Sequence, residues 1–133
     1  MMDIREIHHK FFGFRNGVVA KAFLDAGAPY KRIFGLQLPQ IGEIARETGK
    51  DDALAEALWE ESDCREARLL SCYLFNPENL AMDKALALAR EVKTREEADI
   101  LTWRLLRNLP YAHELLERLD GYTAEALARN LEA

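Results

Sequence analysis

Apolar residues recur every three or four positions along almost the whole chain, and no segment alternates apolar and polar residues as a strand does. This spacing gathers apolar side chains on one stripe of a helix, so the chain is expected to be all-α. Breakers and capping residues divide the pattern into a series of short helices. They are predicted over about residues 3–26, 39–49, 52–61, 66–75, 80–92, 94–109, 111–119 and 123–131.

Local signals mark several of these boundaries. Pro39 suits the first turn of a helix, because its missing N–H would have no partner there in any case. Thr94 and Glu97 have the spacing of a capping box. Gly13 and the pair Asn16-Gly17 are candidate breaks in the first helix. The links are short, so neighbouring helices are expected to run antiparallel and to stack in pairs.

The segment from Ala67 to Phe75 contains only one charged side chain, Arg68. A helix that is apolar almost all round is covered on more than one side, so this segment is predicted to be an inner helix. The charges before it indicate a helix start. Asp63 is predicted as the N-cap and Glu66, three residues later, as its capping-box partner.

The chain of 133 residues has the size of one domain, and a single domain is expected over residues 1–133. Its net charge of −5 argues against a protein that wraps around phosphate backbones. The charge is uneven, however, because residues 1–35 sum to +3 and the remainder to −8. An anion-binding face is expected to use the basic side chains of the first part, and the alternative is an ordinary solvated helix face. The predicted DNA-binding residues are Lys10, Arg15, Lys21, Lys31 and Arg32.

Several classes of protein and site find no support in the sequence. No stretch approaches the roughly 20 apolar residues of a membrane span, and the first residues lack the apolar core of a secretory signal, so a cytoplasmic protein is expected.

Cys64 and Cys72 are predicted to be buried, reduced thiols. The histidines lack the paired spacings of a zinc site and are interpreted as surface residues. No glycine-rich phosphate loop occurs, and no cofactor or metal is expected.

Trp59 and Trp103 are the two tryptophans of the chain. Each is interpreted either as a packing anchor between helical layers or as an aromatic wall for a base or a cation. Glu96, Glu97 and Asp99 follow the predicted N-cap Thr94. Acids in a first turn are favoured by the helix dipole, so their presence alone does not indicate catalysis.

Two stretches between residues 30 and 109 carry a family pattern. "IFGLQLPQIGEIARE" fits Gly-Val-x-x-Pro-x-Leu-Arg-x-Ile-Ala at Gly35, Leu36, Pro39, Ile41, Ile44 and Ala45, with Gly42 in place of the arginine. "LWEESDCREARLLS" fits Leu-Trp-x-Ser-x-x-x-Glu-Ala-Arg at Leu58, Trp59, Ser62, Glu66, Ala67 and Arg68. In these residues the chain resembles the DNA alkylation repair proteins of the AlkD type, HEAT-like-repeat glycosylases that remove cationic N-alkylated purines.

The resemblance implies a HEAT-like α-α superhelix, a solenoid of about three to four antiparallel helix pairs. It implies that Trp59, Glu66 and Arg68 have structural roles, because the motifs that contain them lie on the helices that build and join the early repeats of the family. The family's cleft uses a tryptophan followed four residues later by an aspartate. Here Asp99 fits the acid, whereas the position four before it is Arg95, and Trp103 lies one turn later. Asp99 and Trp103 are therefore the candidate catalytic residues.

Two functions follow. In the first, the protein is a reduced relative of the alkylpurine glycosylases that binds double-stranded DNA through its five N-terminal basic residues. In the second, it keeps only the fold and acts as a non-catalytic scaffold that binds another protein on its concave face. The sequence leaves both open, together with the oligomeric state.

Overall fold

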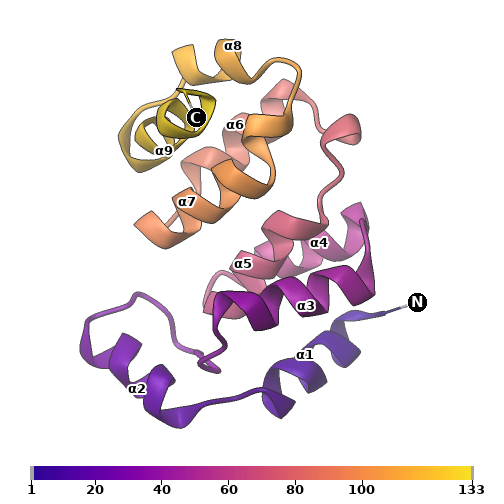
Figure 1. Ribbon diagram of the computed structural model, residues 1–133, viewed down its shortest axis with the longest axis vertical. Coiled ribbons are helices and arrows are strands. Elements are labelled where there is room, and N and C mark those ends of the chain that lie inside the picture. Colours follow the sequence, from indigo (N-terminus) through magenta and orange to yellow (C-terminus); the bar gives the residue numbers. More distant parts are fainter. Residues whose placement is uncertain (1, 133) are drawn as a thin grey trace. The chain divides into compact units, whose positions relative to one another are not determined.

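A computed structural model describes residues 2–132, and its regular structure is helical (Figure 1). The α-helices of this part of the chain are α1 (Ile4–Gly13), α2 (Gly17–Asp25), α3 (Leu38–Thr48), α4 (Asp52–Glu60), α5 (Arg65–Leu74), α6 (Met82–Arg90), α7 (Arg95–Arg104), α8 (Ala112–Glu117) and α9 (Gly121–Glu132). Two 3-10 turns, η1 (Pro77–Asn79) and η2 (Leu106–Asn108), lie between them. The predicted all-α class is confirmed.

The chain divides into two compact units, residues 1–74 and 75–133. In the first unit, α5 packs against both α3 and α4, and α1 contacts α4 (Figure 1). In the second unit, α7 packs against α9, and α8 contacts both α6 and α9. That the whole chain forms a single domain stays a prediction.

Helix α5 is the inner helix of the first unit. Every residue from Arg65 to Leu74 is buried except Tyr73. The buried hydroxyl of Ser71 donates to the carbonyl oxygen of Ala55 on α4 at 2.6 Å. The prediction that this apolar segment forms an inner helix is confirmed, because α3 and α4 both pack against it.

The start of α5 differs from the prediction. The helix begins at Arg65, and the carboxylate of Asp63 pairs with Arg32 instead of forming a capping box with Glu66. The Glu66 carboxylate turns away from its own helix and accepts backbone N–H groups from residues 34–36. The predicted Asp63–Glu66 capping box is wrong, because distant donors take both carboxylates: the Arg32 guanidinium binds Asp63, and backbone N–H groups bind Glu66.

Other predicted boundaries are confirmed. The first segment breaks at Asn16-Gly17, where the Asn16 side chain accepts from the N–H groups of Val18 and Val19 and caps α2. Pro39 lies in the first turn of α3. Thr94 caps α7 by accepting from the Glu97 N–H at 3.1 Å.

Helix α2 is apolar, yet none of its residues is buried. Val18 is 82% exposed and Leu24 48% exposed. Apolar atoms make up more than half of the accessible surface of a typical folded protein, so single exposed apolar residues are ordinary. Two large exposed aliphatic side chains on one short helix are a larger apolar surface than usual. This helix is the most apolar exposed element of the first unit.

Some candidate features are absent from the described residues. No helix within residues 2–132 is long and apolar enough to cross a membrane. The same residues contain no group of three or more His, Cys, Asp or Glu side chains placed to hold a metal ion. Cys64 and Cys72 are free and buried, as predicted.

Candidate nucleic-acid interface

Asp99 lies on the exposed side of α7 and is held by an ion pair. Its Oδ1 accepts from Arg129 Nη2 of α9 at 2.9 Å. The hollow beside this pair has a volume of about 40 Å³ and is lined by Arg95, Tyr122 and Glu125 as well. Small-molecule sites in proteins have volumes of about 300 to 1,000 Å³, so this hollow is far smaller than a typical ligand site.

Trp103 lies one turn after Asp99 and is 42% exposed. The guanidinium carbon of Arg107 lies 3.6 Å from the Trp103 ring centroid, and Arg107 Nε donates to the Trp103 carbonyl at 2.6 Å. The end of α7 therefore presents an aromatic ring with a cation stacked on it. Trp103 is not among the side chains described as lining the hollow at Asp99, so the two candidate catalytic residues share a helix but not a pocket.

Three of the five predicted DNA-binding residues have acidic partners. Lys10 lies 2.7 Å from Glu47, Lys21 lies 2.7 Å from Asp25, and Arg32 lies 3.1 Å from Glu61 and 3.3 Å from Asp63. The hydrogen bond from Arg32 also lowers the pKa of the Asp63 carboxyl. A phosphate must compete with these carboxylates, which weakens the three cations as anion-binding groups.

Arg15 and Lys31 differ from these three. Both are exposed, and in residues 2–132 no carboxylate contacts either one. The Arg15 guanidinium stacks on the Phe12 ring, 3.8 Å from its centroid, and donates to the Phe12 carbonyl at 2.9 Å. These two cations are the predicted DNA contacts that remain available to a phosphate.

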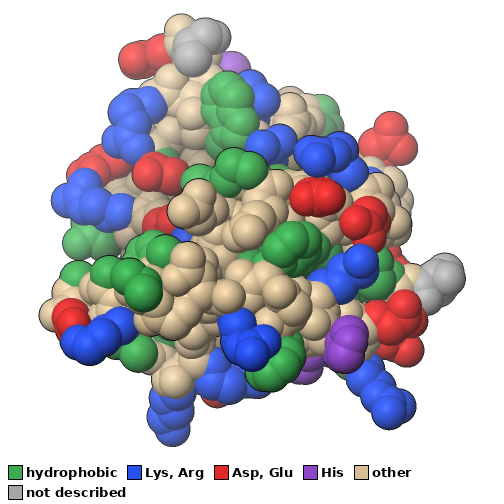
Figure 2. Space-filling model, turned by 60° about the horizontal axis from the view of Figure 1, so that its bottom comes forward, with side chains coloured by type: hydrophobic (Ala, Val, Ile, Leu, Met, Phe, Trp, Pro, Cys, Tyr) green, Lys and Arg blue, Asp and Glu red, His purple; other side chains and the backbone are tan. Residues whose placement is uncertain are grey.

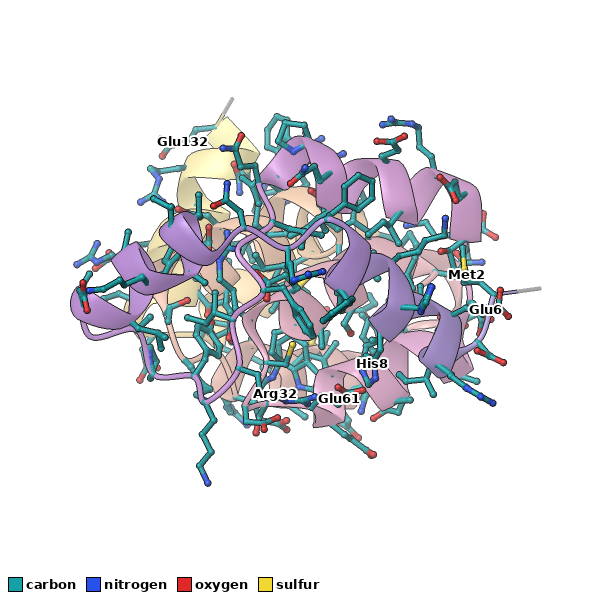
Figure 3. All side chains as sticks on the ribbon, turned by 90° about the horizontal axis from the view of Figure 1, so that it is seen from below. Met2, Glu6, His8, Arg32, Glu61 and Glu132 are labelled. Atoms are coloured by element: carbon teal, nitrogen blue, oxygen red, sulfur yellow. The ribbon has the colours of Figure 1, made fainter. Side chains whose placement is uncertain are left out.

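A polar cluster in the first unit was not predicted. His8 Nε2 lies 2.7 and 2.9 Å from the two oxygens of Glu61, and Arg32 Nη2 lies 3.1 Å from one of them (Figure 3). Glu61 is the C-cap of α4, so the cluster ties α1 and the segment around Arg32 to that helix end. His8 and Glu61 are 53 positions apart, and no local pattern in the sequence indicates their pairing.

The family motif around Glu66 builds a second, buried network. Glu66 Oε1 accepts from the Phe34 N–H at 2.9 Å, and Oε2 accepts from the Gly35 and Leu36 N–H groups at 3.1 and 3.3 Å. Arg65 Nη1 donates to Glu66 Oε2 and to the Leu36 carbonyl, both at 2.8 Å. The carboxylate thus fixes the backbone of residues 34–36 against the start of α5.

The other motif residues form a stacked pair in the core. The Arg68 guanidinium lies 3.9 Å from the Trp59 ring centroid. Trp59 is 2% exposed and Arg68 4%. A tryptophan this deeply buried packs between helices and has no free face for a base.

A cavity opens at the junction of α1 and α2. It has a volume of about 550 Å³ and is lined by Phe12, Arg15, Gly17, Ala20, Ile33 and Phe34. Two aromatic rings, two aliphatic side chains and one cation, Arg15, thus line the cavity. The sequence did not indicate it, because its walls come from two helix ends and from the irregular segment before α3.

Residues 9–127 match the family described as DNA alkylation repair enzyme. The chain belongs to this family. The match covers most of the chain and includes the motifs at Glu66 and Arg68, whose buried network the structure displays. No curated protein matches the sequence.

A solved structure supports the fold of this DNA alkylation repair family member. It is described as "A new family of proteins related to the HEAT-like repeat DNA glycosylases with affinity for branched DNA structures". The two chains superpose with a TM-score of 0.84 at 14% sequence identity, over 98% of the present chain and 56% of the solved one. The predicted HEAT-like fold is confirmed, and the chain spans little more than half the length of that protein.

Proposed function

We propose that this protein binds DNA and that the Trp103–Arg107 pair holds a base. The observation that carries the proposal is the exposed Trp103 ring with the Arg107 guanidinium stacked on it at 3.6 Å. Exposed aromatic rings beside arginine are a common means of binding unpaired bases, since stacking contributes about 1 to 3 kcal/mol per base. The guanidinium adds a charge for the neighbouring phosphate.

The preferred DNA is one in which bases are unstacked. The similar solved structure is described as having affinity for branched DNA, and branch points expose bases that a regular duplex keeps paired. An aromatic platform such as Trp103 gains most from those bases, because a base in a duplex already has stacking partners. We therefore propose that branched duplexes are bound more tightly than linear ones.

Binding without base release is the function that the Asp99 site supports. The carboxylate is paired with Arg129 at 2.9 Å, and the hollow of about 40 Å³ beside it is far smaller than a typical ligand site. Asp99 is the residue that would stabilise a cationic nucleotide if release did occur. We expect Asp99→Asn to leave the protein folded. In an assay of base release from alkylated DNA, we expect the wild type and Asp99→Asn both to release bases at the rate of the protein-free control.

Few phosphate contacts are expected, since Lys10, Lys21 and Arg32 are paired with carboxylates. Arg15, Lys31 and Arg107 remain as proposed phosphate contacts. Each neutralised phosphate adds about −0.9 to the slope of log K against log salt, so a slope of about −3 is expected. A protein that used all five predicted N-terminal cations would show a steeper slope.

The experiment is fluorescence anisotropy with three labelled DNAs of equal length: a linear duplex, a duplex with an abasic-site analogue and a branched junction. Each is titrated at several salt concentrations. We expect the junction to bind most tightly and Trp103→Ala to weaken junction binding by about tenfold, with Leu24→Ala, an exposed apolar residue outside this pair, as the control. Absence of binding to all three DNAs at low salt would refute the proposal.

A second function is favoured by the exposed face of α2. Val18 and Leu24 on this helix are exposed, and exposed apolar side chains on one helix are typical of surfaces that bind proteins. Under this alternative the protein is a scaffold without nucleotide chemistry. It predicts that the wild type binds none of the three DNAs even at low salt, whereas DNA binding that weakens with salt would argue against it.

A further inference from the structure

We infer that the cavity at the junction of α1 and α2 binds an unpaired nucleotide of a DNA strand, with the base against Phe12 and Phe34 and the phosphate at Arg15. The inference deepens the proposed DNA-binding function and rests on it for the source of the nucleotide. It adds a contact in the first unit to the Trp103–Arg107 pair of the second. The cavity, the charge at its edge and the rigidity of its walls carry the argument.

The walls suit a flat aromatic ligand. Phe12 is 54% exposed at the C-terminal end of α1, and Phe34, on the segment before α3, also lines the cavity. Phe34 is braced from behind by the buried Phe11, with the two ring centroids 5.5 Å apart. Nucleobases stack on aromatic rings and on the planes of arginine guanidinium groups, and both surfaces are present here.

Hydrogen bonds and close packing hold the backbone of the cavity lining at Phe34 and of the adjacent Gly35. Phe34 donates its backbone N–H to the buried Glu66 carboxylate and accepts at its carbonyl from the Asn16 N–H at 2.8 Å. Gly35 approaches α2 so closely that a Cβ at this position would lie 2.2 Å from the Asn16 carbonyl oxygen. A preformed cavity loses little conformational freedom when it binds a ligand, which favours affinity.

The charge of the cavity selects an anion. Arg15 is its one ionisable lining residue, and none of the six lining side chains is acidic. The hollow at Asp99, by contrast, has two carboxylates beside its two arginines, and the surface hollow around Arg5 and Lys10 includes Asp3 and Glu6. A phosphate therefore meets a guanidinium without a neighbouring carboxylate at Arg15 and meets carboxylates beside the cations in the other two hollows.

The size of the cavity fits a nucleotide. Small-molecule sites in proteins occupy about 300 to 1,000 Å³, and this cavity measures about 550 Å³. The face turned forward in Figure 2 carries green apolar patches among both blue Lys and Arg and red Asp and Glu side chains, so the preference for an anion rests on the lining of the cavity and not on the face as a whole. A paired base keeps its stacking partners, so the occupant is an unpaired one.

The test compares two labelled duplexes of the same sequence, one fully paired and one carrying a single-nucleotide bulge. For the wild type we expect about tenfold tighter binding to the bulged duplex. Phe12→Ala should remove that preference, and Arg15→Gln should weaken binding to the bulge by about tenfold. The matched controls are Leu24→Ala, an exposed apolar residue outside the cavity, and Lys21→Gln, a cation of α2 outside it. Both should bind like the wild type.

Different failures identify different errors. If the wild type binds DNA but Phe12→Ala and Arg15→Gln bind like the controls, the cavity inference is overturned and the proposed function stands. If no DNA binds, the proposed function fails, and the cavity is tested alone with deoxyadenosine monophosphate by NMR. Shifts of the Gly17 and Ala20 amides would support the cavity as a nucleotide site, and unchanged spectra would overturn it.

Discussion

Arg65 Nη1 lies 2.8 Å from Glu66 Oε2, and both side chains are buried at the start of α5. Adjacent residues on a helix point in different directions, so this pair meets only because both side chains turn toward the same backbone segment. Glu66 accepts its N–H groups and Arg65 donates to its Leu36 carbonyl. The family motif is thus a clamp on residues 34–36.

Glu66→Gln is expected to destabilise the protein by about 3 to 5 kcal/mol. The substitution removes the negative charge that lies 2.8 Å from the buried Arg65 guanidinium and turns an amide N–H₂ toward backbone donors. Urea unfolding followed by circular dichroism measures the change. Asp25→Asn, which removes an exposed ion pair with Lys21, is the control and should cost less than about 0.5 kcal/mol. A change of similar size in both variants would contradict the clamp.

Trp59→Ala is expected to cost about 3 to 5 kcal/mol, because it empties a core position under the Arg68 guanidinium. Trp103→Ala is the matched substitution at a ring that is 42% exposed, and it should cost about 1 kcal/mol or less. Thermal or denaturant unfolding by far-ultraviolet circular dichroism compares them without relying on tryptophan fluorescence. Equal costs would show that the burial of Trp59 contributes little.

Gly35→Ala is expected to be more destabilising than Gly27→Ala. Both glycines have positive φ, +90° and +86°, so each alanine is strained by about 1 to 2 kcal/mol. At Gly35 the added methyl group also lies 2.2 Å from the Asn16 carbonyl oxygen, whereas nothing lies within 4 Å at Gly27. The difference in unfolding free energy should be about 1 to 3 kcal/mol. If the two variants unfold alike, α2 moves freely away from the segment before α3.

Stability should fall as the pH rises from about 9 to about 11 because of Cys64. Burial raises the pKa of this thiol from its ordinary value of 9.0 to about 11. In that window the folded protein keeps a proton that the unfolded chain has lost, so each step up in pH favours unfolding. Cys64→Ala should flatten this part of the stability profile. Alkylation by iodoacetamide at pH 8 should be slow at Cys64 until the protein unfolds.

Persistence of the alkaline loss of stability in Cys64→Ala would assign that loss to another group. Tyr111, whose pKa is raised by burial, titrates in the same direction. The difference between wild type and variant isolates the Cys64 contribution, since Tyr111 is present in both.

Much of the helical architecture followed from the sequence. The apolar run of Ala67–Phe75 predicts an inner helix because helical spacing alone determines how many of its faces are apolar. Asn16, Pro39 and Thr94 act on the backbone within three residues, so the boundaries that they mark were predictable. The family motifs led to the same HEAT-like fold that the structural comparison shows.

The partners of charged side chains were decided by the tertiary structure. Asp63 and Glu66 have the spacing of a local cap, yet they bind Arg32 and the N–H groups of residues 34–36, about 30 positions away. His8 meets Glu61 across 53 positions, and Asp99 meets Arg129 across 30. The spacing of apolar residues predicts which face of a helix is buried. The partner of a charged side chain and the walls of a cavity depend instead on which segments, distant in sequence, pack against them. The helices could therefore be predicted from the sequence, whereas the Phe12–Arg15 cavity and the acidic partners of the basic residues could not.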